Sequence, residues 1–318
     1  MIHPDTASLI GGTPMVELKR LTRGLRGALY AKVEFLNPGL SKKDRIARQI
    51  IDDAMAAGRL RPGDTVVELT SGNTGTGLAI VCAVRGLRFV AVMSAGNSAE
   101  RRRMMEALGA RVEIVPQALG SPPGHTSGED LALVERRAQE ITDELKAFRA
   151  DQFRNASNER AHEEGTAREI WNDLGERVTA FCDFVGTGGT LLGIARALKR
   201  RNPRIRCYAI EPASAAILAG HAVTNQNHRI QGGGYSMTVP RWDPTLVDGY
   251  VTVTDEEAIH WARELASREG LFAGFSSGAN VAGAMKLLDG SQKESAAAHV
   301  VFTINDSGLK YLSTDLWP

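Results

Sequence analysis

Apolar and polar residues follow two different periods along this chain, one typical of strands and one typical of helices. The stretch 28–35 alternates with a period of two, which predicts a strand, and the Pro-Gly pair at 38–39 ends it. Apolar residues then recur at helical spacing over 46–55, so a helix follows. Ser41 stands where a side chain can cap the start of this helix.

The same succession of strand and helix recurs along the rest of the chain. Such alternation predicts an α/β fold with mostly parallel sheets that helices cover on both faces. Two segments, 117–128 and 213–249, look irregular, and we interpret the first as a surface loop and the second as a functional or mobile connection. We expect strands at 64–69, 88–93, 110–115, 178–185, 206–210, 251–253 and 299–304, and helices at 75–83, 98–108, 129–148, 191–199 and 254–267, with another after 278.

Composition and charge narrow the class of protein. Of the 318 residues, 43% are hydrophobic and 24% are charged, which is ordinary for a globular protein, and the net charge of +1 argues against a nucleic-acid or membrane-surface role. The basic clusters 101–103 and 199–201 fall on expected helices, so we interpret them as solvated faces. The apolar stretch 77–84 is too short to span a bilayer, and the N-terminus does not resemble a signal peptide.

The cysteines and histidines do not predict a metal site. Cys82, Cys182 and Cys207 lie in apolar patterns without metal-like spacing, and buried reduced thiols of a cytoplasmic protein explain them. The pairs Glu159-x-x-His162 and Glu257-x-x-His260 have the spacing of a di-metal carboxylate site. Such a site needs a four-helix bundle, which this strand-rich chain does not predict, so we interpret both as helix-surface pairs.

Lys43 is the candidate reactive residue. It lies near the start of the first helix, where the helix dipole disfavours an ammonium group. A desolvated lysine loses its proton more easily, and a neutral amine forms a Schiff base with an aldehyde cofactor. The alternative is that Lys42 and Lys43 are two solvated surface charges.

Two loops between a strand and a helix are candidate anion sites. Residues 70–75 form a hydroxyl-rich loop that can hold a carboxylate or a phosphate, or serve only as a polar connection. Residues 186–190 are rich in glycine, which lets the backbone approach a phosphate closely. This second loop lacks the dinucleotide and Walker patterns, so a small phosphate is the better ligand. A tight turn in which glycine serves packing is the alternative.

Together these motifs resemble the fold type II pyridoxal-phosphate enzymes, especially the cysteine synthase (O-acetylserine sulfhydrylase) and cystathionine β-synthase branch. The resemblance covers nearly the whole chain in the same order, and the combination is far more specific than any one motif. It is carried by Gly12-Thr13-Pro14, Asn37-Pro38, Ser41-x-Lys43-Asp44-Arg45, Thr70-Ser71-Gly72-Asn73-Thr74-Gly75, Gln152-Phe153, Gly186-Thr187-Gly188-Gly189-Thr190, Ser276-Ser277-Gly278 and Tyr311-Leu312-Ser313-Thr314.

The resemblance implies a role for each matching residue. Lys43 would form the internal aldimine with pyridoxal 5'-phosphate, Asn73 would contact the ring oxygen, and Ser276 would bind the pyridine nitrogen. Because a serine is neutral, it does not force protonation of that nitrogen, which suits β-elimination better than transamination. The cofactor phosphate would lie on Gly186, Thr187, Gly188, Gly189 and Thr190. The substrate would be held by Thr70, Ser71, Gly72, Thr74, Gln152 and Gly232.

The activity implied is a β-replacement on an O-activated serine or a similar amino acid, through an aminoacrylate intermediate. Lys43 would remove the α-proton, the leaving group would depart, and a nucleophile would add at Cβ. One alternative is a lyase or dehydratase that eliminates without replacement. Another is a non-catalytic scaffold held by a partner such as a serine acetyltransferase. A nucleotide-binding oxidoreductase is disfavoured because the dinucleotide fingerprint is missing.

The sequence departs from the family pattern at loops that would flank the second substrate. Leu40 replaces a small residue, and Lys42 replaces the common valine before the lysine. Residues 94–98 replace Pro-Glu-Thr-Met-Ser, and residues 232–237 replace Gly-Ile-Gly-Ala-Gly-Phe. Tyr235 and Ser236 in the latter either select a nucleophile larger than sulfide or reflect drift in a tolerant loop.

For the architecture we expect two α/β domains with the cofactor in the cleft between them. The smaller, mobile domain would span 46–150, and the larger, which binds the cofactor phosphate, would comprise 1–45 and 151–318. By resemblance the assembly is a homodimer. The expected partners are a small amino acid and a small nucleophile, with no nucleic acid, membrane or metal.

Overall fold

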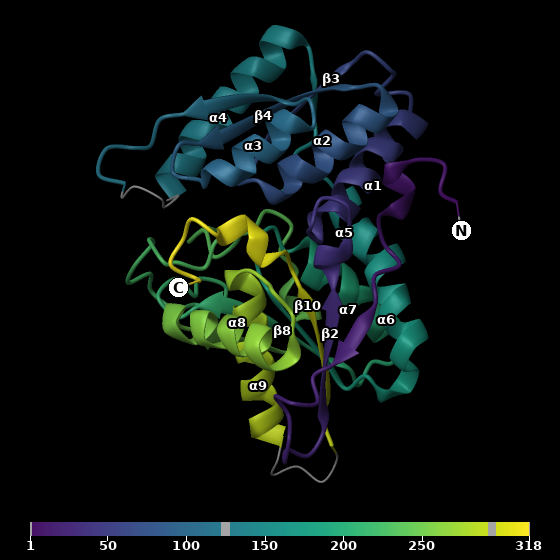
Figure 1. Cartoon of the computed structure of the whole chain (residues 1–318), viewed down its shortest axis with the longest axis vertical. Helices are drawn as coiled ribbons and strands as arrows, with labels where there is room; N and C mark the ends of the chain where they lie inside the picture. The colour runs from purple at the N-terminus through teal and green to yellow at the C-terminus, as the bar shows by residue number, and fades with distance from the viewer. Residues whose placement is uncertain (1, 122–127, 292–296, 318) are drawn as a thin grey trace.

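The structure is a computed structural model that describes residues 2–121, 128–291 and 297–317. Its strands form two separate sheets, one above the other in Figure 1. The strands are β1 Met15–Glu17, β2 Ala28–Val33, β3 Thr65–Leu69, β4 Arg88–Ser94, β5 Arg111–Val115, β6 Phe148–Arg149, β7 Ala180–Phe184, β8 Arg206–Pro212, β9 Gly249–Val253 and β10 His299–Ile304. The longer helices are α1 Lys43–Ala56, α2 Asn73–Arg85, α3 Ala99–Ala107, α4 Gly128–Leu145, α6 Ala167–Leu174, α7 Gly189–Arg201, α8 Asp255–Glu269 and α9 Phe275–Ser291.

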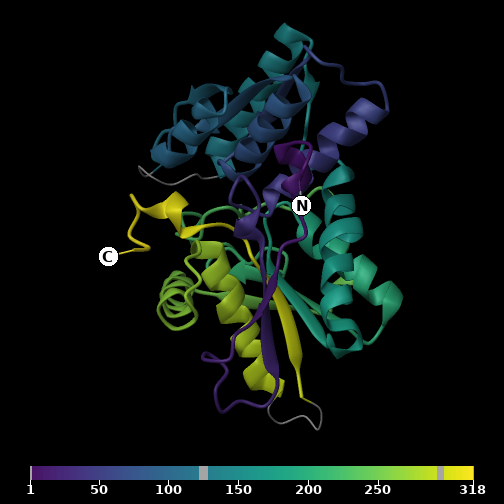
Figure 2. The same cartoon turned by 45° about the vertical axis from the view of Figure 1, so that its right-hand side comes forward.

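The smaller sheet has the strand order β5-β4-β3-β6, and all its pairs are parallel. Successive side chains of β3 point to opposite faces, so Val66 packs with α1 and α2 while Val67 packs with α4. In Figures 1 and 2, α4 covers the face turned away from the larger sheet. Both faces are therefore buried, as the apolar run in this strand predicted.

The larger sheet has the strand order β1-β2-β10-β7-β8-β9, in which only the described pair β1–β2 is antiparallel. The strand β7 has the same two-sided pattern: Phe184 packs with α8 and α9, and Phe181 packs with α6 and α7. Helices therefore cover both faces of this sheet as well. The predicted α/β fold with mostly parallel sheets is confirmed.

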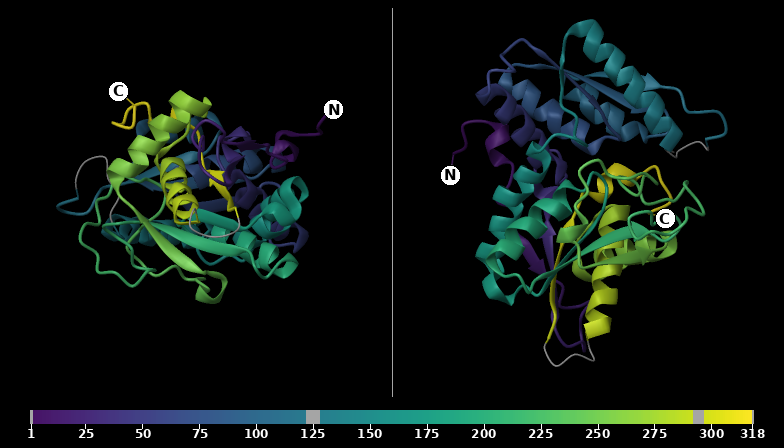
Figure 3. Two further views of the ribbon diagram at one scale, coloured as in Figure 1. Left: turned by 90° about the horizontal axis from the view of Figure 1, so that it is seen from below. Right: turned by 180° about the vertical axis from the view of Figure 1, so that it is seen from behind.

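The described terminal segments lie near the junction of the two sheets. The short 3-10 helix Thr6–Leu9 packs Ala7 against the core of the smaller sheet, and Figure 3 shows this segment at the junction. After β10 the chain runs beneath α3, where the Ser313 hydroxyl donates a hydrogen bond to Glu100 at 2.9 Å. The division into domains at residues 46 and 150 stays a prediction.

Several local expectations differ from the structure. The helix expected to reach Phe148 ends at Leu145, because Phe148–Arg149 pairs with β3 as a short parallel strand. Ser41 is not the N-cap of α1; Lys42 is, and the Ser41 hydroxyl accepts the Lys43 N–H at 3.2 Å from one position earlier. The cap expected at Thr254 is confirmed, with a reciprocal capping box to Glu257.

The irregular character of 213–249 is confirmed up to β9, apart from the 3-10 turn Pro244–Leu246. The middle of the other expected loop, residues 122–127, lies outside the described residues. Within the described ranges, no helix combines the length and apolar character needed to cross a bilayer. Nor do the described side chains bring three His, Cys, Asp or Glu residues together as a metal site would require.

Candidate active site

Lys43 is the first residue of α1 and lies where two cavities meet, at the carboxyl ends of β3, β7 and β10. Gly232 also lines both cavities. The first cavity contains the predicted cofactor residues Asn73, Gly186, Thr187, Gly188, Thr190 and Ser276, and the second contains the predicted substrate residues Thr70, Ser71, Thr74 and Gln152. The remaining two predicted residues lie at helix starts, Gly72 as the N-cap of α2 and Gly189 as the first residue of α7.

The electrostatic surroundings of Lys43 favour a neutral amine. Burial, the largest cause, and the positive charge of Lys42 together lower the pKa of Lys43 to about 7, although the Asp183 carboxylate opposes them. Much of the amine is therefore unprotonated near neutral pH, so Lys43 can act as a nucleophile or a base. Lys42 is buried, at 6% exposure, and Lys43 is half-buried, so the two lysines are not a pair of solvated surface charges.

The glycine-rich turn joins the end of β7 to the start of α7. Gly188 has φ = +81°, a conformation that favours glycine. A Cβ atom at Gly189 would lie 2.0 Å from Oδ1 of Asn158, so this position has no room for a side chain. The start of α7 leaves its first N–H groups without partners inside the helix, and an anion can accept hydrogen bonds from them.

Two buried side chains orient the threonines of this turn. Asn158 donates a hydrogen bond to Thr187 Oγ1 at 2.8 Å. The two ring nitrogens of His162 lie 3.0 Å from Thr166 Oγ1 and 3.2 Å from Thr190 Oγ1. Burial and nearby lysine and arginine charges lower the pKa of His162 well below its usual value, so the ring is neutral. The interpretation of Glu159 and His162 as a helix-surface pair is wrong, because both are buried.

The hydroxyl-rich loop is held by its own side chains. Thr70 Oγ1 accepts the N–H groups of Gly72 and Gly75, each at 2.9 Å, which leaves its proton free to donate to a ligand. Thr74 donates to Gln152 at 2.6 Å, and Gln152 donates in turn to the Leu69 carbonyl at 3.0 Å. The loop therefore closes the end of β3 and directs the start of α2 toward the cavity.

Asn73 is fixed by the C-terminal segment. Its amide nitrogen donates to Asp306 at 2.7 Å, and its amide oxygen accepts from Lys310 at 2.7 Å. The hydroxyl of Tyr311 donates to the same Asp306 oxygen at 2.6 Å. Sequence reasoning did not assign Asp306 or Lys310 to the site. The available indication was that Asp306 follows the carboxyl end of the buried strand β10, where ligands commonly bind.

A buried ion pair on the wall of the first cavity was also missed. The ammonium group of Lys42 lies 2.6 and 2.9 Å from the two carboxylate oxygens of Asp183, and both side chains are almost fully buried. The chain departs from the family pattern at Lys42, which was the one sign of this pair in the sequence. A lysine in a position that is commonly valine requires a buried acceptor.

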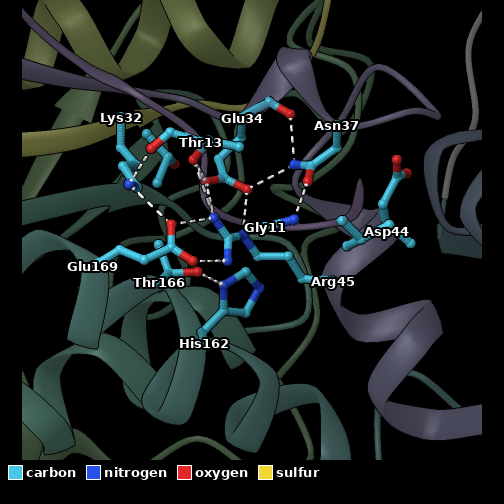
Figure 4. A network of polar contacts seen from close by, with 12 residues as sticks. Gly11, Thr13, Lys32, Glu34, Asn37, Asp44, Arg45, His162, Thr166 and Glu169 are labelled. Carbon is cyan, nitrogen blue, oxygen red and sulfur yellow. Dashed lines mark hydrogen bonds and ion pairs between the residues drawn. The ribbon is translucent and has the colours of Figure 1, made fainter. Parts of the chain in front are cut away.

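A second network of ion pairs, centred on Arg45, fixes the first turn of α1. Arg45 donates to Glu34 at 2.6 and 2.8 Å and to both oxygens of Glu169 at 2.7 Å (Figure 4). Lys32 pairs with the same Glu169 at 2.9 Å. Although burial alone would raise it, the pKa of Glu169 falls to about 2 because Arg45 and Lys32 stabilise its charge. These contacts tie the helix that bears Lys43 to β2 and α6.

Arg101 does not belong to a solvated face. Its side chain is 1% exposed, and it packs over the Tyr311 ring with the guanidinium carbon 5.0 Å from the ring centroid. It donates to the Ser71 carbonyl at 2.6 Å and lines the second cavity. The sequence offered only a weak indication that Arg101 is buried. Met105 lies four residues later, on the same face of the helix, and is itself buried.

An outer cavity of about 480 Å³ opens beside the second one. The two share Ser71, Arg101, Gly232 and Tyr235 as walls, so the outer space leads toward Lys43. Tyr235 also bonds through its side chain to Ser71. The other walls include the polar residues Asn97, Asn225, Gln226, Asn227 and His228.

Two α/β units with a half-buried lysine between two helix N-termini have the architecture of the fold type II pyridoxal-phosphate enzymes. The profile of the family described as "Pyridoxal-phosphate dependent enzyme" matches residues 6–306. Cysteine synthase B of Campylobacter jejuni is 38% identical over 317 residues, which cover 99% of each chain. O-ureido-L-serine synthase of Streptomyces lavendulae is 40% identical over 309 residues, covering 97% of this chain and 90% of the relative.

The structures agree with the sequences. The O-acetylserine dependent cystathionine β-synthase of Helicobacter pylori superposes with a TM-score of 0.90 at 32% identity, covering 100% of both chains. The chain therefore belongs to the pyridoxal-phosphate dependent enzyme family, in its cysteine synthase and cystathionine β-synthase branch, and its cofactor is pyridoxal 5'-phosphate. The resemblance that the motifs carried is confirmed.

The side chains around Lys43 fit this cofactor. The turn at 186–190 offers an anion the N-terminus of a 13-residue helix and has no room for a Cβ at Gly189. A partly neutral lysine amine lines the same cavity, as an aldehyde cofactor requires.

Proposed function

We propose that this enzyme catalyses β-replacement on an amino acid whose Cβ carries a leaving group, such as an O-activated serine. The observation that carries the proposal is the place of Lys43, whose partly neutral amine lies between a candidate phosphate site and a candidate carboxylate site. The names of the relatives agree with this reaction class: cysteine synthase, O-ureido-L-serine synthase and O-acetylserine dependent cystathionine β-synthase.

In this proposal the cofactor is held by residues of the first cavity. The backbone of 186–190 and the hydroxyls of Thr187 and Thr190 bind its phosphate, Asn73 contacts its ring oxygen, and Ser276 bonds to its pyridine nitrogen. When bound, pyridoxal phosphate withdraws electrons from Cα of the substrate, which acidifies the α-proton. Ser276 is neutral and moderates this withdrawal, in keeping with β-chemistry.

The substrate is held by residues of the second cavity. The hydroxyls of Thr70, Ser71 and Thr74, the backbone at Gly72 and the amide of Gln152 bind the α-carboxylate, with Gly232 on the opposite wall. The neutral amine of Lys43 takes the α-proton, and the leaving group departs from Cβ. The nucleophile then bonds to Cβ, and Lys43 returns the proton to Cα.

We also propose a nucleophile larger than sulfide. The outer cavity of about 480 Å³ far exceeds the volume that sulfide needs, and its polar walls offer hydrogen bonds to an organic molecule. Tyr235 lies between this space and the substrate cavity. A nucleophile that enters here passes Tyr235 and Arg101 before it reaches Cβ.

The test is the visible absorption spectrum of the purified enzyme as O-acetylserine, O-phosphoserine, serine and cysteine are added in turn. One donor should shift the cofactor band, and added nucleophiles should restore it while a new amino acid appears. Pyruvate and ammonia as the main products, even with nucleophile present, would identify a β-eliminating lyase. A preference for sulfide over thiols and ureido compounds would contradict the larger nucleophile.

The variant Lys43→Ala provides the control. It should lose the original cofactor band and at least about 1,000-fold in turnover, because both roles of the amine disappear. Full turnover in this variant would contradict the assignment of Lys43. Lys19→Ala, at an exposed position paired with Glu17, should leave both properties unchanged.

For the assembly we propose a homodimer in the cytoplasm. Buried free thiols at Cys82, Cys182 and Cys207 suit a reducing compartment, and the dimer rests on the family resemblance. Light scattering coupled to size exclusion tests the dimer directly. A mass near the 34.2 kDa of one chain would contradict it.

A further inference from the structure

The Lys42–Asp183 ion pair joins three elements that meet at the cofactor cavity. Lys42 is the N-cap of α1, directly before Lys43, and its backbone N–H donates to the Asn305 carbonyl after β10 at 2.9 Å. Asp183 lies in β7, three residues before the glycine-rich turn begins. Each partner therefore belongs to an element that carries part of the site.

The third element is α9, which carries Ser276. Asn280, one helical turn after Ser276, donates to Asp183 at 3.0 Å and accepts the Phe184 N–H at 2.6 Å. The hydroxyl of Thr303 lies 2.7 Å from the same Asp183 oxygen. The Asp183 carboxylate is thus the shared acceptor that connects the lysine helix, the strand before the phosphate turn, and the serine helix.

Few other charges face Lys43. Lys42 and Asp183 line the first cavity, Arg101 from α3 lines the second, and His162 is neutral. Lys42 and Asp183 are 6% and 2% exposed, so little water screens them. A fixed ammonium group beside Lys43 disfavours a second ammonium group there, and the Asp183 carboxylate reduces but does not cancel this effect.

We propose that the Lys42–Asp183 pair is a positioning element of the cofactor site: it sets the lysine helix, the phosphate turn and Ser276 relative to one another and holds a positive charge beside Lys43. This inference rests on the proposed roles of those three groups. Lys42 acts through Lys43 and forms no bond to the substrate. Lys42 stands at the position where the family pattern commonly has valine.

The test compares Lys42→Met, Asp183→Asn, the double variant and Lys42→Arg with the wild type. The cofactor is removed from each full-length protein and pyridoxal phosphate is added back from about pH 5 to about pH 10. The rate of capture reports the neutral fraction of Lys43, and equilibrium titration gives the affinity for pyridoxal phosphate. Neither readout depends on turnover.

The expected pH midpoints of capture have a fixed order. Asp183→Asn should lie below the wild type because it removes the charge that stabilises the Lys43 ammonium. The double variant should lie above the wild type, and Lys42→Met should lie highest, by about one pH unit. Lys42→Arg should stay near the wild type because it keeps the positive charge.

The affinity for pyridoxal phosphate should fall at least about 10-fold in Lys42→Met and in Asp183→Asn, because each leaves one buried charge without its partner. In the double variant this affinity should partly recover. Equal midpoints in the wild type and the double variant would overturn the role of the charge. Unchanged affinity in both single variants would overturn the positioning role. If Lys42→Met does not fold, Asp183→Asn and the double variant still give the order.

A failure of the proposed reaction has a different signature. Wild-type enzyme that captures pyridoxal phosphate but converts none of the donors would contradict β-replacement. The pH midpoints of cofactor capture would still test the role of the Lys42–Asp183 pair. Wild-type enzyme that captures no cofactor would contradict both.

Discussion

The ammonium group of Lys310 donates a hydrogen bond to the side-chain oxygen of Asn73 at 2.7 Å, across 237 positions of sequence. Lys310 also donates to the Gly39 carbonyl at 2.7 Å, in the turn before Lys43. One C-terminal side chain therefore supports both the lysine turn and the start of α2. The last segment of the described chain is part of the site, although no residue in it was predicted to bind the cofactor.

Lys310→Met should lower kcat/KM by about 10- to 100-fold, because a hydrogen bond from a charged donor contributes about 1.5 to 3 kcal/mol. Asn73 would lose a partner, and the buried Asp44 and Asp306 would lose a neighbouring charge. Steady-state kinetics and cofactor titration measure the effect. The control is Lys286→Met, which removes a surface pair with Glu257 and should leave kcat/KM within about 2-fold.

Gly189→Ala should weaken binding of pyridoxal phosphate by at least about 10-fold. The added methyl group would overlap Asn158, which orients Thr187, so the turn must move. Equilibrium dialysis against the cofactor provides the measurement. Gly290→Ala is the matched control: it also lies in a helix, a Cβ there meets nothing within 4 Å, and this variant should bind normally with a slightly raised Tm.

Tyr235→Phe should raise the KM for the amino-acid substrate by about 10-fold, because the phenol loses its bond to Ser71 while its ring stays in place. The cofactor affinity should not change, since Tyr235 lines the second and outer cavities but not the first. Initial rates over a range of substrate concentrations separate KM from kcat. An equal loss of cofactor binding would show that the effect is a general loss of structure.

Glu169→Gln should destabilise the enzyme at neutral pH and much less in acid. The pKa of Glu169 is about 2 in the folded chain, below its ordinary value of 4.5. Its contribution to stability is therefore complete above pH 4.5 and is lost as the pH falls toward 2. At pH 7 it reaches about 3 kcal/mol.

Denaturant unfolding of the wild type and Glu169→Gln at pH 7 and in acid measures this effect. The difference in unfolding free energy should shrink as the pH falls. A difference that is independent of pH would mean that the side chain acts through packing and not through charge. Glu164→Gln, at an exposed neighbouring position, should have little effect at either pH.

The sequence could predict those features that depend on contacts between residues close together in the chain. The helix start at Lys43 and the turn at 186–190 follow from neighbouring residues, and the structure has both. The Lys42–Asp183 and Lys310–Asn73 contacts join residues 141 and 237 positions apart, and no local pattern pairs them. Only the three-dimensional structure shows that Asp183 is the partner of Lys42 and that Lys310 is the partner of Asn73.

Two of the local predictions that were wrong failed for related reasons. Arg101 follows the pattern of a charged surface cluster, yet Tyr311 and the Ser71 carbonyl cover it. Phe148 continues the apolar period of α4, but β3 offers an unpaired edge, and pairing there takes Phe148–Arg149 out of the helix. In both cases contacts with distant segments overrode a local preference.

The two attachments of α1 have a mechanical consequence. Its apolar residues Ile50 and Ile51 are packed in the core of the smaller sheet, whereas Arg45, two residues after Lys43, is bonded to Glu34 and Glu169 beside the larger one. A rotation of the smaller unit relative to the larger one would therefore have its axis near the first turn of α1. Lys43 lies in this turn, so its amine would move less than groups of the smaller unit that lie far from it, and Asn73 would stay bonded to Asp306 and Lys310 of the C-terminal segment.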